Sequence, residues 1–180
     1  MISKSLEKAL NDQVNAEYYS AYLYLSMSGY MEQTPLKGTA HWLYLQAIEE
    51  MTHATHMYQY LLDRGAAPVF PEIQAPPASY AGIHEVFEAV LDHEQKVTAS
   101  INAIASLAMK EHDHACYQFI MWYVNEQVEE EAKVSDILGT LSFAGTDNGL
   151  LFSLDSELAA RVFHNPFPTD AKLSILAAGA

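Results

Sequence analysis

Apolar side chains recur every three or four residues in four long stretches of the chain, which is the spacing of amphipathic helices. The pattern predicts helices over residues 3–33, 35–64, 83–111 and 113–144. The stripes read, in chain order, Leu10, Val14, Glu17, Ala21, Tyr24, Ser28, Met31; Leu43, Gln46, Glu50, His53, Met57, Tyr60; Phe87, Val90, Glu94, Val97, Ile101, Ile104, Ala108; and Cys116, Ile120, Tyr123, Gln127, Glu130, Val134, Ile137, Leu141.

Residues at the predicted helix ends agree with this division. Thr34 and Asp113 are expected to cap the second and fourth helices, and Gly65 to end the second. The turn-forming run 145–149 should end the fourth helix. A short fifth helix is expected over residues 153–163, stopped before Pro166.

The connection over residues 66–82 contains four prolines and is too long for an ordinary turn between helices. A helix of about 28 residues is roughly 42 Å long, and an extended segment of about 17 residues reaches on the order of 55 Å. The connection can therefore return along the bundle, so that the third helix runs parallel to the second. The predicted fold is an all-α four-helix bundle with one long crossover and a short fifth helix. It occupies residues 1–164, and a C-terminal tail, 165–180, is expected to be mobile or to dock on a neighbour.

Each stripe is interrupted near its middle by acidic or polar residues. These are Glu17, Glu50 with His53, Glu94, and Gln127 with Glu130. A buried carboxylate costs several kcal/mol unless it is paired, and the stripes contain no Lys or Arg. Two divalent cations would neutralise four carboxylates, and oxygen ligands with one imidazole suit iron or manganese. The competing interpretation is a water-filled polar layer, or carboxylates turned towards solvent.

Further polar residues adjoin this layer. Tyr24 lies two turns after Glu17 and could donate an electron or a hydrogen bond, or simply pack in the core. A second acidic group comprises Glu49, Glu126, Glu129 and Glu130. It predicts a third metal position, with a solvated acidic face as the alternative.

The composition narrows the classes of function. With 23 acidic and 9 basic residues, a formal net charge of −14 disfavours binding to nucleic acid or anionic membranes. A single cysteine, Cys116, excludes an intrachain disulfide and is expected to be buried and inert. No signal peptide or membrane-spanning run is recognised, so the expected location is cytoplasmic. The remaining histidines are expected on the surface or in packing: His41, His56, His84, His112, His114 and His164.

Several large apolar residues fall outside the core stripes. A second stripe on the first helix contains Tyr18, Tyr22, Leu25 and Gly29, and Trp42 and Tyr44 lie beside the stripe of the second helix. In a monomeric bundle these residues would be exposed to solvent. They therefore predict a subunit contact.

The chain resembles the bacterial non-haem ferritins from Met1 to about Phe163. The residues that carry the resemblance are Glu17, the run Glu49-Glu50-Met51-Thr52-His53, the run His93-Glu94-Gln95, and Trp122-Tyr123 followed by Glu126 to Glu131. The resemblance implies a 24-subunit shell that stores ferric mineral. It implies a ferroxidase centre with Glu17, Glu50 and His53 on one iron, and with Glu50, Glu94 and Glu130 on the other. Gln127 would be a polar partner, and a third iron site would use Glu49, Glu126, Glu129 and Glu130.

Two departures separate the chain from related families. Bacterioferritins, which it also resembles, carry a second Glu-x-x-His where this chain has Gln127-Val128-Glu129-Glu130. Met51 falls where those proteins ligate haem, but haem is not expected here. Tyr117 and Ile120 replace the acidic residues of the three-fold pore in animal ferritins, which leaves the route of iron open.

The predicted function is oxidation of Fe²⁺ by O₂ or peroxide, followed by storage of ferric iron in a homo-oligomeric shell. Three alternatives stay open at this stage. They are a haem-containing bacterioferritin, a di-iron oxygenase or peroxidase without a cage, and a structural bundle that binds no metal.

Overall fold

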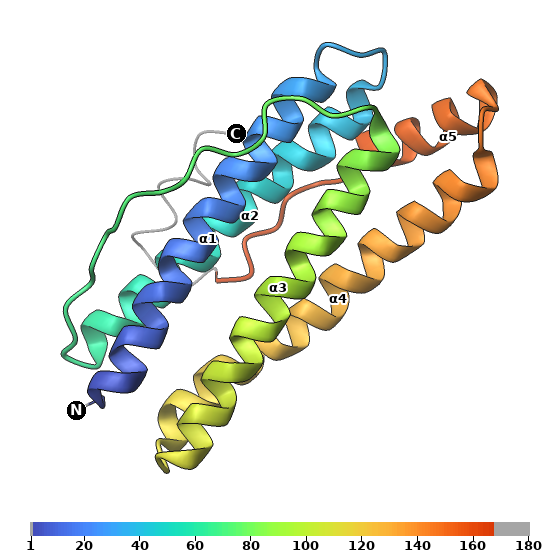
Figure 1. The fold of residues 1–180 in the computed structure, drawn as a ribbon. Helices are drawn as coiled ribbons and strands as arrows, with labels where there is room; N and C mark the ends of the chain where they lie inside the picture. The colour runs from blue at the N-terminus through green and yellow to red at the C-terminus, as the bar shows by residue number, and fades with distance from the viewer. Residues whose placement is uncertain (1, 168–180) are drawn as a thin grey trace.

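The computed structural model describes residues 2–167, which form five helices and no strand (Figure 1). The helices are α1 (Lys4–Met31), α2 (Lys37–Asp63), α3 (Ile83–Lys110), α4 (His114–Ala144) and α5 (Asn148–Ala159). The predicted four-helix bundle with a short fifth helix is confirmed. Most of the predicted tail, residues 168–180, lies outside the described residues.

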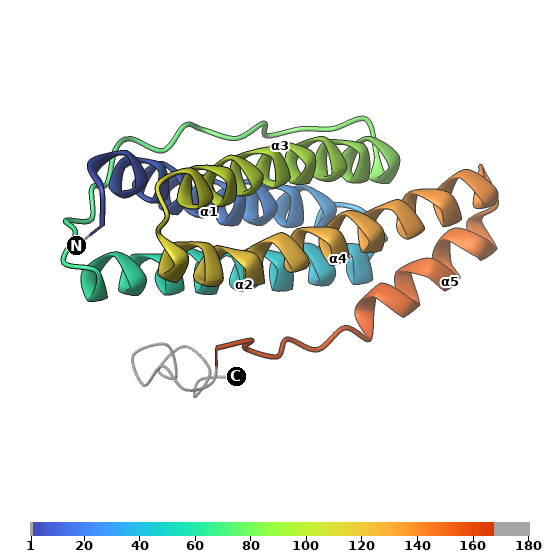
Figure 2. The same ribbon diagram turned by 90° about the horizontal axis from the view of Figure 1, so that it is seen from below.

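The four long helices form two hairpins, α1 with α2 and α3 with α4, joined by the crossover (Figures 1 and 2). The crossover returns along the outside of α1, as its length predicts. The Asn11 side chain fixes its first part, donating to the Ala67 carbonyl at 3.2 Å and accepting from the Val69 N–H at 2.6 Å. Tyr30 fixes its last part by donating to the Tyr80 carbonyl at 2.5 Å. The third helix therefore runs parallel to the second.

Helix ends differ from the prediction at two places. Thr34 accepts from the Leu36 N–H at 3.1 Å, and α2 begins only at Lys37, without a side-chain cap of its own. The fifth helix begins at Asn148 and ends at Ala159, several residues before the predicted range at both ends. Asp147 opens it by accepting from the backbone N–H groups of the next turn at 2.8 and 3.2 Å. The run 145–149, which was predicted to form a turn, therefore contains the N-cap of the fifth helix. Asp is favoured both in turns and at helix N-caps.

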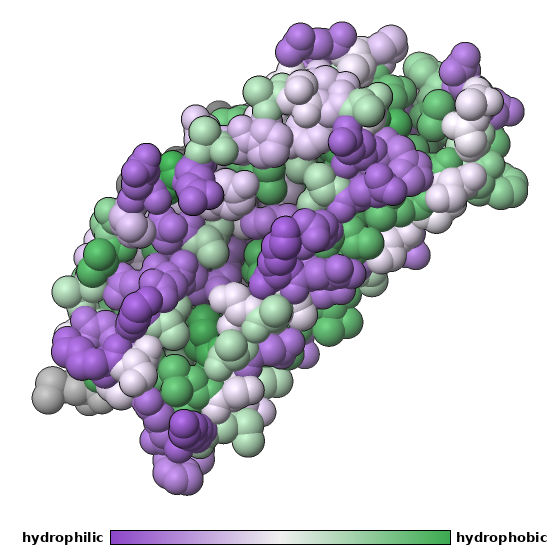
Figure 3. All heavy atoms as spheres, viewed as in Figure 1, coloured by the Kyte–Doolittle hydropathy of each residue, from purple (hydrophilic) through white to green (hydrophobic). Residues whose placement is uncertain are grey.

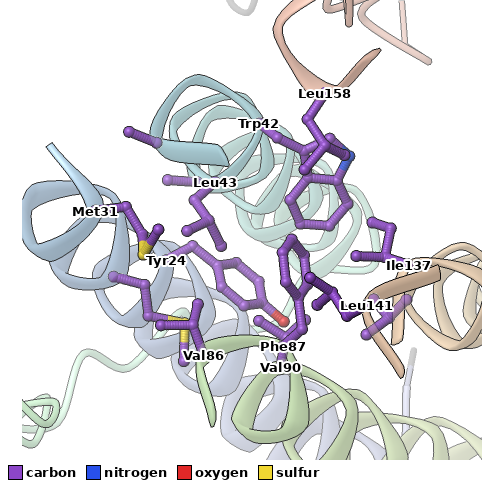
Figure 4. Packing of buried hydrophobic residues seen from close by; sticks show 14 of the residues in the cluster. Tyr24, Met31, Trp42, Leu43, Val86, Phe87, Val90, Ile137, Leu141 and Leu158 are labelled. Carbon is purple, nitrogen blue, oxygen red and sulfur yellow. The ribbon is translucent and has the colours of Figure 1, made fainter. Parts of the chain in front are cut away.

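Buried apolar side chains form two clusters, one towards each end of the bundle, with the polar residues between them. The cluster near α5 contains Tyr24, Leu43 and Phe87 from three helices, and Leu158 from α5 (Figure 4). Cys116 is buried in the other cluster, as expected.

The prediction that Trp42 would be wet in a single bundle is wrong. Trp42 is 5% exposed, and its ring meets Phe87 edge-on at 5.4 Å (Figure 4). Leu158 of α5 belongs to the same cluster. The cause is α5, which packs across the first turns of α2. Tyr22 and Tyr44 remain half exposed, as expected.

Docking of α5 depends on a polar contact with the start of α2. The Asp155 carboxylate accepts from the Gly38 N–H at 2.9 Å and from the Thr39 N–H at 2.7 Å. It satisfies N–H groups that have no partner within the helix. A Cβ on Gly38 would lie 1.8 Å from the Asp155 carbonyl oxygen, so only glycine permits this approach.

Hydrophilic residues cover much of the face that carries the crossover, α1 and α3, with apolar residues scattered among them (Figure 3). Val69 and Phe70 are among the exposed apolar side chains of the crossover. No helix within residues 2–167 has the length and hydropathy needed to cross a membrane.

Candidate metal centre

Four carboxylates, one from each long helix, lie in the buried middle of the bundle. Glu17, Glu50, Glu94 and Glu130 are between 1 and 3% exposed. The ligand atoms of Glu17, Glu50 and His53 lie within 4.8 Å of one another, a separation that one metal ion can span. The i,i+3 spacing on α2 places Glu50 and His53 on one face of the helix.

Three glutamine side chains donate hydrogen bonds to the four carboxylates. The amide of Gln46 donates to Glu130 at 2.8 Å and to Glu50 at 3.3 Å, so these two carboxylates share one donor. The other two amides each serve a single carboxylate: Gln13 donates to Glu17 at 2.8 Å, and Gln127 donates to Glu94 at 2.9 Å. Each of the four predicted carboxylates therefore accepts a hydrogen bond from a glutamine amide.

Tyr24 lies directly on this layer. Its hydroxyl is completely buried and donates a short hydrogen bond to Glu94. Burial, followed by the charge of Glu94, raises the pKa of the Tyr24 hydroxyl well above 10. Tyr24 is therefore a neutral donor at physiological pH.

The imidazole of His53 is polar, buried and only half satisfied. Its Nδ1 lies 3.1 Å from a Glu50 oxygen, whereas Nε2 has no hydrogen-bond partner among the described residues. Buried polar nitrogens are rarely left unpaired in folded proteins. An open imidazole nitrogen beside carboxylates is a donor set suited to a divalent cation.

Burial makes the charged form of these carboxylates unfavourable. It raises the pKa of Glu17 from 4.5 to about 8, with the charge of Glu50 as the second cause. Burial likewise raises the pKa of Glu94 to about 7 and that of Glu50 well above its ordinary value. Without a cation, the layer therefore retains protons at neutral pH, which a bound metal would displace.

A lysine side chain reaches one carboxylate of the layer from its rim. The predicted stripes contain no Lys or Arg, but Lys133 donates to Glu130 at 3.0 Å from a side chain that is 41% exposed. It lies three residues beyond Glu130 and outside the core stripe. A single flexible ammonium group cannot neutralise four carboxylates.

A second acidic group borders the first on the side of α2 and α4. The ligand atoms of Glu49, His53 and Glu126 lie within 4.8 Å of one another. Glu129, which was predicted to join this group, is exposed and is not part of it. Glu130 lies with the deeper layer, where it meets Gln46.

Sequence reasoning missed Arg161, which lies between α5 and the end of the described chain. Its guanidinium forms an ion pair with Glu49 and donates to Gln46 at 2.7 Å. No periodic pattern could have identified it, because it belongs to no helix. Gln46 carried a signal, since it lies on the core stripe one turn before Glu50.

The predicted surface stripe lines an apolar groove of about 480 Å³ on α1 and α2. Tyr18, Tyr22, Leu25, Tyr44 and Met51 contribute to its walls. Met51 is 37% exposed and faces away from the carboxylate layer.

Comparison with known proteins agrees with this fold. The ferritin-like domain matches residues 7–144, and the chain belongs to the ferritin family. It is 40% identical to a probable bacterial non-heme ferritin-like protein of Haemophilus influenzae, over 88% of this chain and 96% of the relative. It is 37% identical to a bacterial non-heme ferritin of Staphylococcus aureus, over 91% and 98% of the two chains.

Solved structures of ferritins share this fold. An open-pore ferritin of the archaeon Archaeoglobus fulgidus is 43% identical, with a TM-score of 0.88 over 89% of this chain and 98% of the other. A variant of that ferritin engineered to a closed form has a TM-score of 0.89 at the same identity, over 91% and 100% of the two chains.

Proposed function

We propose that the protein oxidises Fe²⁺ and stores the resulting ferric iron. The single observation that carries the proposal is the buried layer of four carboxylates around an imidazole nitrogen without a partner. Membership of the ferritin family and a 37% identical relative named as a bacterial non-heme ferritin support it.

The proposed iron ligands come from the buried carboxylate layer and from the second acidic group. Glu17, Glu50 and His53 would bind one Fe²⁺, and Glu50, Glu94 and Glu130 a second, with Glu50 shared between them. A third ion would bind Glu49 and Glu126. His53 borders both groups, but a neutral imidazole has one nitrogen lone pair and serves one ion at a time. Glu129 could contribute only if its exposed side chain moved. Iron is the substrate here, so the ligands must release it, and a shell made mainly of carboxylates suits that exchange.

The surrounding residues perform the supporting chemistry. Gln46 and Gln127 hold carboxylates in place, and Tyr24 fixes Glu94 from the opposite side. The apolar clusters on both sides of the layer exclude water, which strengthens attraction between carboxylates and bound cations. Protons displaced from Glu17 and Glu94 leave as iron binds.

We further propose assembly into a shell of 24 subunits. The apolar groove lined by Tyr22, Leu25 and Tyr44 supports a contact between subunits. Gel filtration measures this directly. A species near 20 kDa or a dimer would favour an oxygenase or peroxidase that needs no cage.

Glu50→Ala tests the proposed centre, because it removes the ligand shared by both iron positions. We expect the rapid phase of Fe²⁺ oxidation in stopped-flow absorbance to fall by more than about tenfold. Glu88→Ala, which removes the same charge from an exposed position on α3, is the control and should retain the native rate. Equal rates in native protein and Glu50→Ala would refute the proposal.

A visible spectrum separates the haem-binding alternative. We expect the purified protein to lack a Soret band. Anomalous scattering from crystals soaked in Fe²⁺ would then locate each ion against the predicted ligands.

A further inference from the structure

Arg161 places a fixed positive charge on the second acidic group. The segment that carries it leaves α5 and runs back along α2 (Figure 2). Its Nη2 donates a short hydrogen bond to Glu49, and its Nη1 donates to the Gln46 side-chain oxygen at 2.7 Å and to the Trp42 carbonyl at 3.3 Å. The guanidinium also lies 4.7 Å from the centre of the Trp42 ring, within cation–π range.

The backbone around Arg161 is held in place from both sides. The Arg161 carbonyl lies 3.0 Å from Nε2 of His41. Further along, the ring of Phe167 stacks on His56 with centroids 3.7 Å apart, and it lies 4.6 Å from Trp122. The Arg161 side chain is only 18% exposed, so its position depends on packing and not on chance contact with solvent-exposed acids.

The second acidic group has features that point to a cation ligand. Glu49, His53 and Glu126 lie within reach of a single ion, and the buried Nε2 of His53 has no partner. Glu49 is nevertheless already neutralised by a guanidinium, which does not lose its proton in proteins. A metal ion and Arg161 therefore require the same carboxylate.

We propose that Arg161 competes with divalent cations for Glu49 and thereby sets the occupancy of the second acidic group. This inference rests on the proposed function, in which Glu49 and Glu126 receive a third ion. Filling the group requires Arg161 to release Glu49. Weak occupancy keeps this group exchangeable, so that iron passes through it instead of remaining there.

The same arginine connects the two groups. By donating to the side-chain oxygen of Gln46, Arg161 directs the amide nitrogen of that residue towards Glu130 and Glu50. Nη2 of Arg161 donates to Glu49 and Nη1 donates to Gln46, so one guanidinium contacts a residue of each group.

Calorimetric titration of the metal-free protein with Zn²⁺ tests the competition without any redox reaction. We expect Arg161→Gln to raise the Zn²⁺ affinity of the weaker class of sites by about tenfold, the scale of one charged hydrogen bond. The stronger class should change less than the weaker class, because the Gln46 amide keeps Glu130 and Glu50 as acceptors. Glu126→Gln should abolish the weaker class in both backgrounds, which identifies it as the second acidic group.

Arg64→Gln is the matched control. Arg64 pairs with Asp113 at 2.7 Å, and its side chain is 19% exposed, close to the 18% of Arg161. The two substitutions remove the same charge from ion pairs of similar burial, but Arg64 lies at the other end of α2. We expect native Zn²⁺ binding in Arg64→Gln.

Two results would overturn the inference. One is that the weaker class of sites binds Zn²⁺ with the same affinity in the native protein and in Arg161→Gln. The other is that Arg64→Gln raises this affinity as much as Arg161→Gln does, which would show that only the net charge matters. Arg161→Lys separates competition from loss of structure, because it keeps the charge and should bind Zn²⁺ more weakly than Arg161→Gln. Failure of the proposed function would instead leave the stronger class intact in Glu50→Ala.

Discussion

Asp155 accepts hydrogen bonds from both the backbone N–H and the hydroxyl of Thr39, at 2.7 and 2.8 Å. Helix α2 lacks a side-chain cap of its own, so α5 provides one from 116 residues further along the chain. A carboxylate at a helix N-terminus is also favoured by the helix dipole. The fifth helix is therefore an integral part of the bundle.

Asp155→Ala should lower the free energy of unfolding by about 1–2 kcal/mol, because it removes a cap and leaves buried donors unpaired. Urea denaturation of the metal-free protein measures the loss. Ser156→Ala, which removes an exposed hydroxyl bonded only within α5, should change stability little. An unchanged midpoint in Asp155→Ala would show that α5 does not stabilise α2.

Gly38→Ala should displace α5, since the new methyl group would meet the Asp155 carbonyl at 1.8 Å. We expect a loss of about 1–3 kcal/mol, as for other overpacked sites. Gly139→Ala in α4 is the control, because a Cβ there meets nothing within 4 Å and alanine favours the helix. In thermal melts, we expect Gly38→Ala to lower the melting temperature and the control substitution to raise it. A change in the same direction for both variants would contradict the docking geometry.

Tyr24→Phe removes the hydroxyl that fixes Glu94. Residues that orient metal ligands typically contribute a factor of about 10 to 100 in affinity or activity, so we expect at least about tenfold slower Fe²⁺ oxidation. Tyr30→Phe makes the same chemical change at a hydroxyl bonded to the crossover and should keep the native rate. Stopped-flow absorbance compares the two. Native kinetics in Tyr24→Phe would assign this tyrosine to packing alone.

The metal-free protein should lose stability as the pH rises from about 5 to 8. The pKa of Glu17 is raised to about 8 in the folded state, from 4.5, so the native state binds more protons than the unfolded state across this range. The stability from this group is complete below pH 4.5 and is lost as the pH approaches 8.

Glu17→Gln isolates this contribution, because glutamine has a similar shape and does not titrate. Calorimetry at pH 5 and pH 8 should show a smaller alkaline loss in this variant than in the native chain. Zn²⁺ should restore the stability of the native chain at pH 8, because the bound cation replaces the protons that the carboxylates have lost. Parallel pH profiles for the two proteins would contradict the link to Glu17.

The sequence predicts the bundle and the deeper carboxylate layer for the same reason. Both follow from helical periodicity, which places Glu17, Glu50, Glu94 and Glu130 at matching heights. The crossover length then decides the direction of α3. These features depend on spacing within helices, which a single sequence records.

Contacts between helices and irregular segments cannot be predicted from helical periodicity. Trp42 appeared exposed because nothing in the pattern shows that α5 folds back over α2. Arg161 lies outside every helix, so its contact with Glu49 could not be anticipated. Glu129 is exposed because Glu130, one residue further along the helix, faces the core.

The crossover is exposed along most of its length and joins two hairpins that each contribute to the carboxylate layer. Glu17 and Glu50 come from one hairpin, and Glu94 and Glu130 from the other. A cut within this loop would divide the chain into two hairpins that share both apolar clusters, and neither hairpin would hold all four carboxylates. Reassociation of the separate halves should then depend on metal concentration, which would make the loop a natural position for building a split sensor of divalent ions.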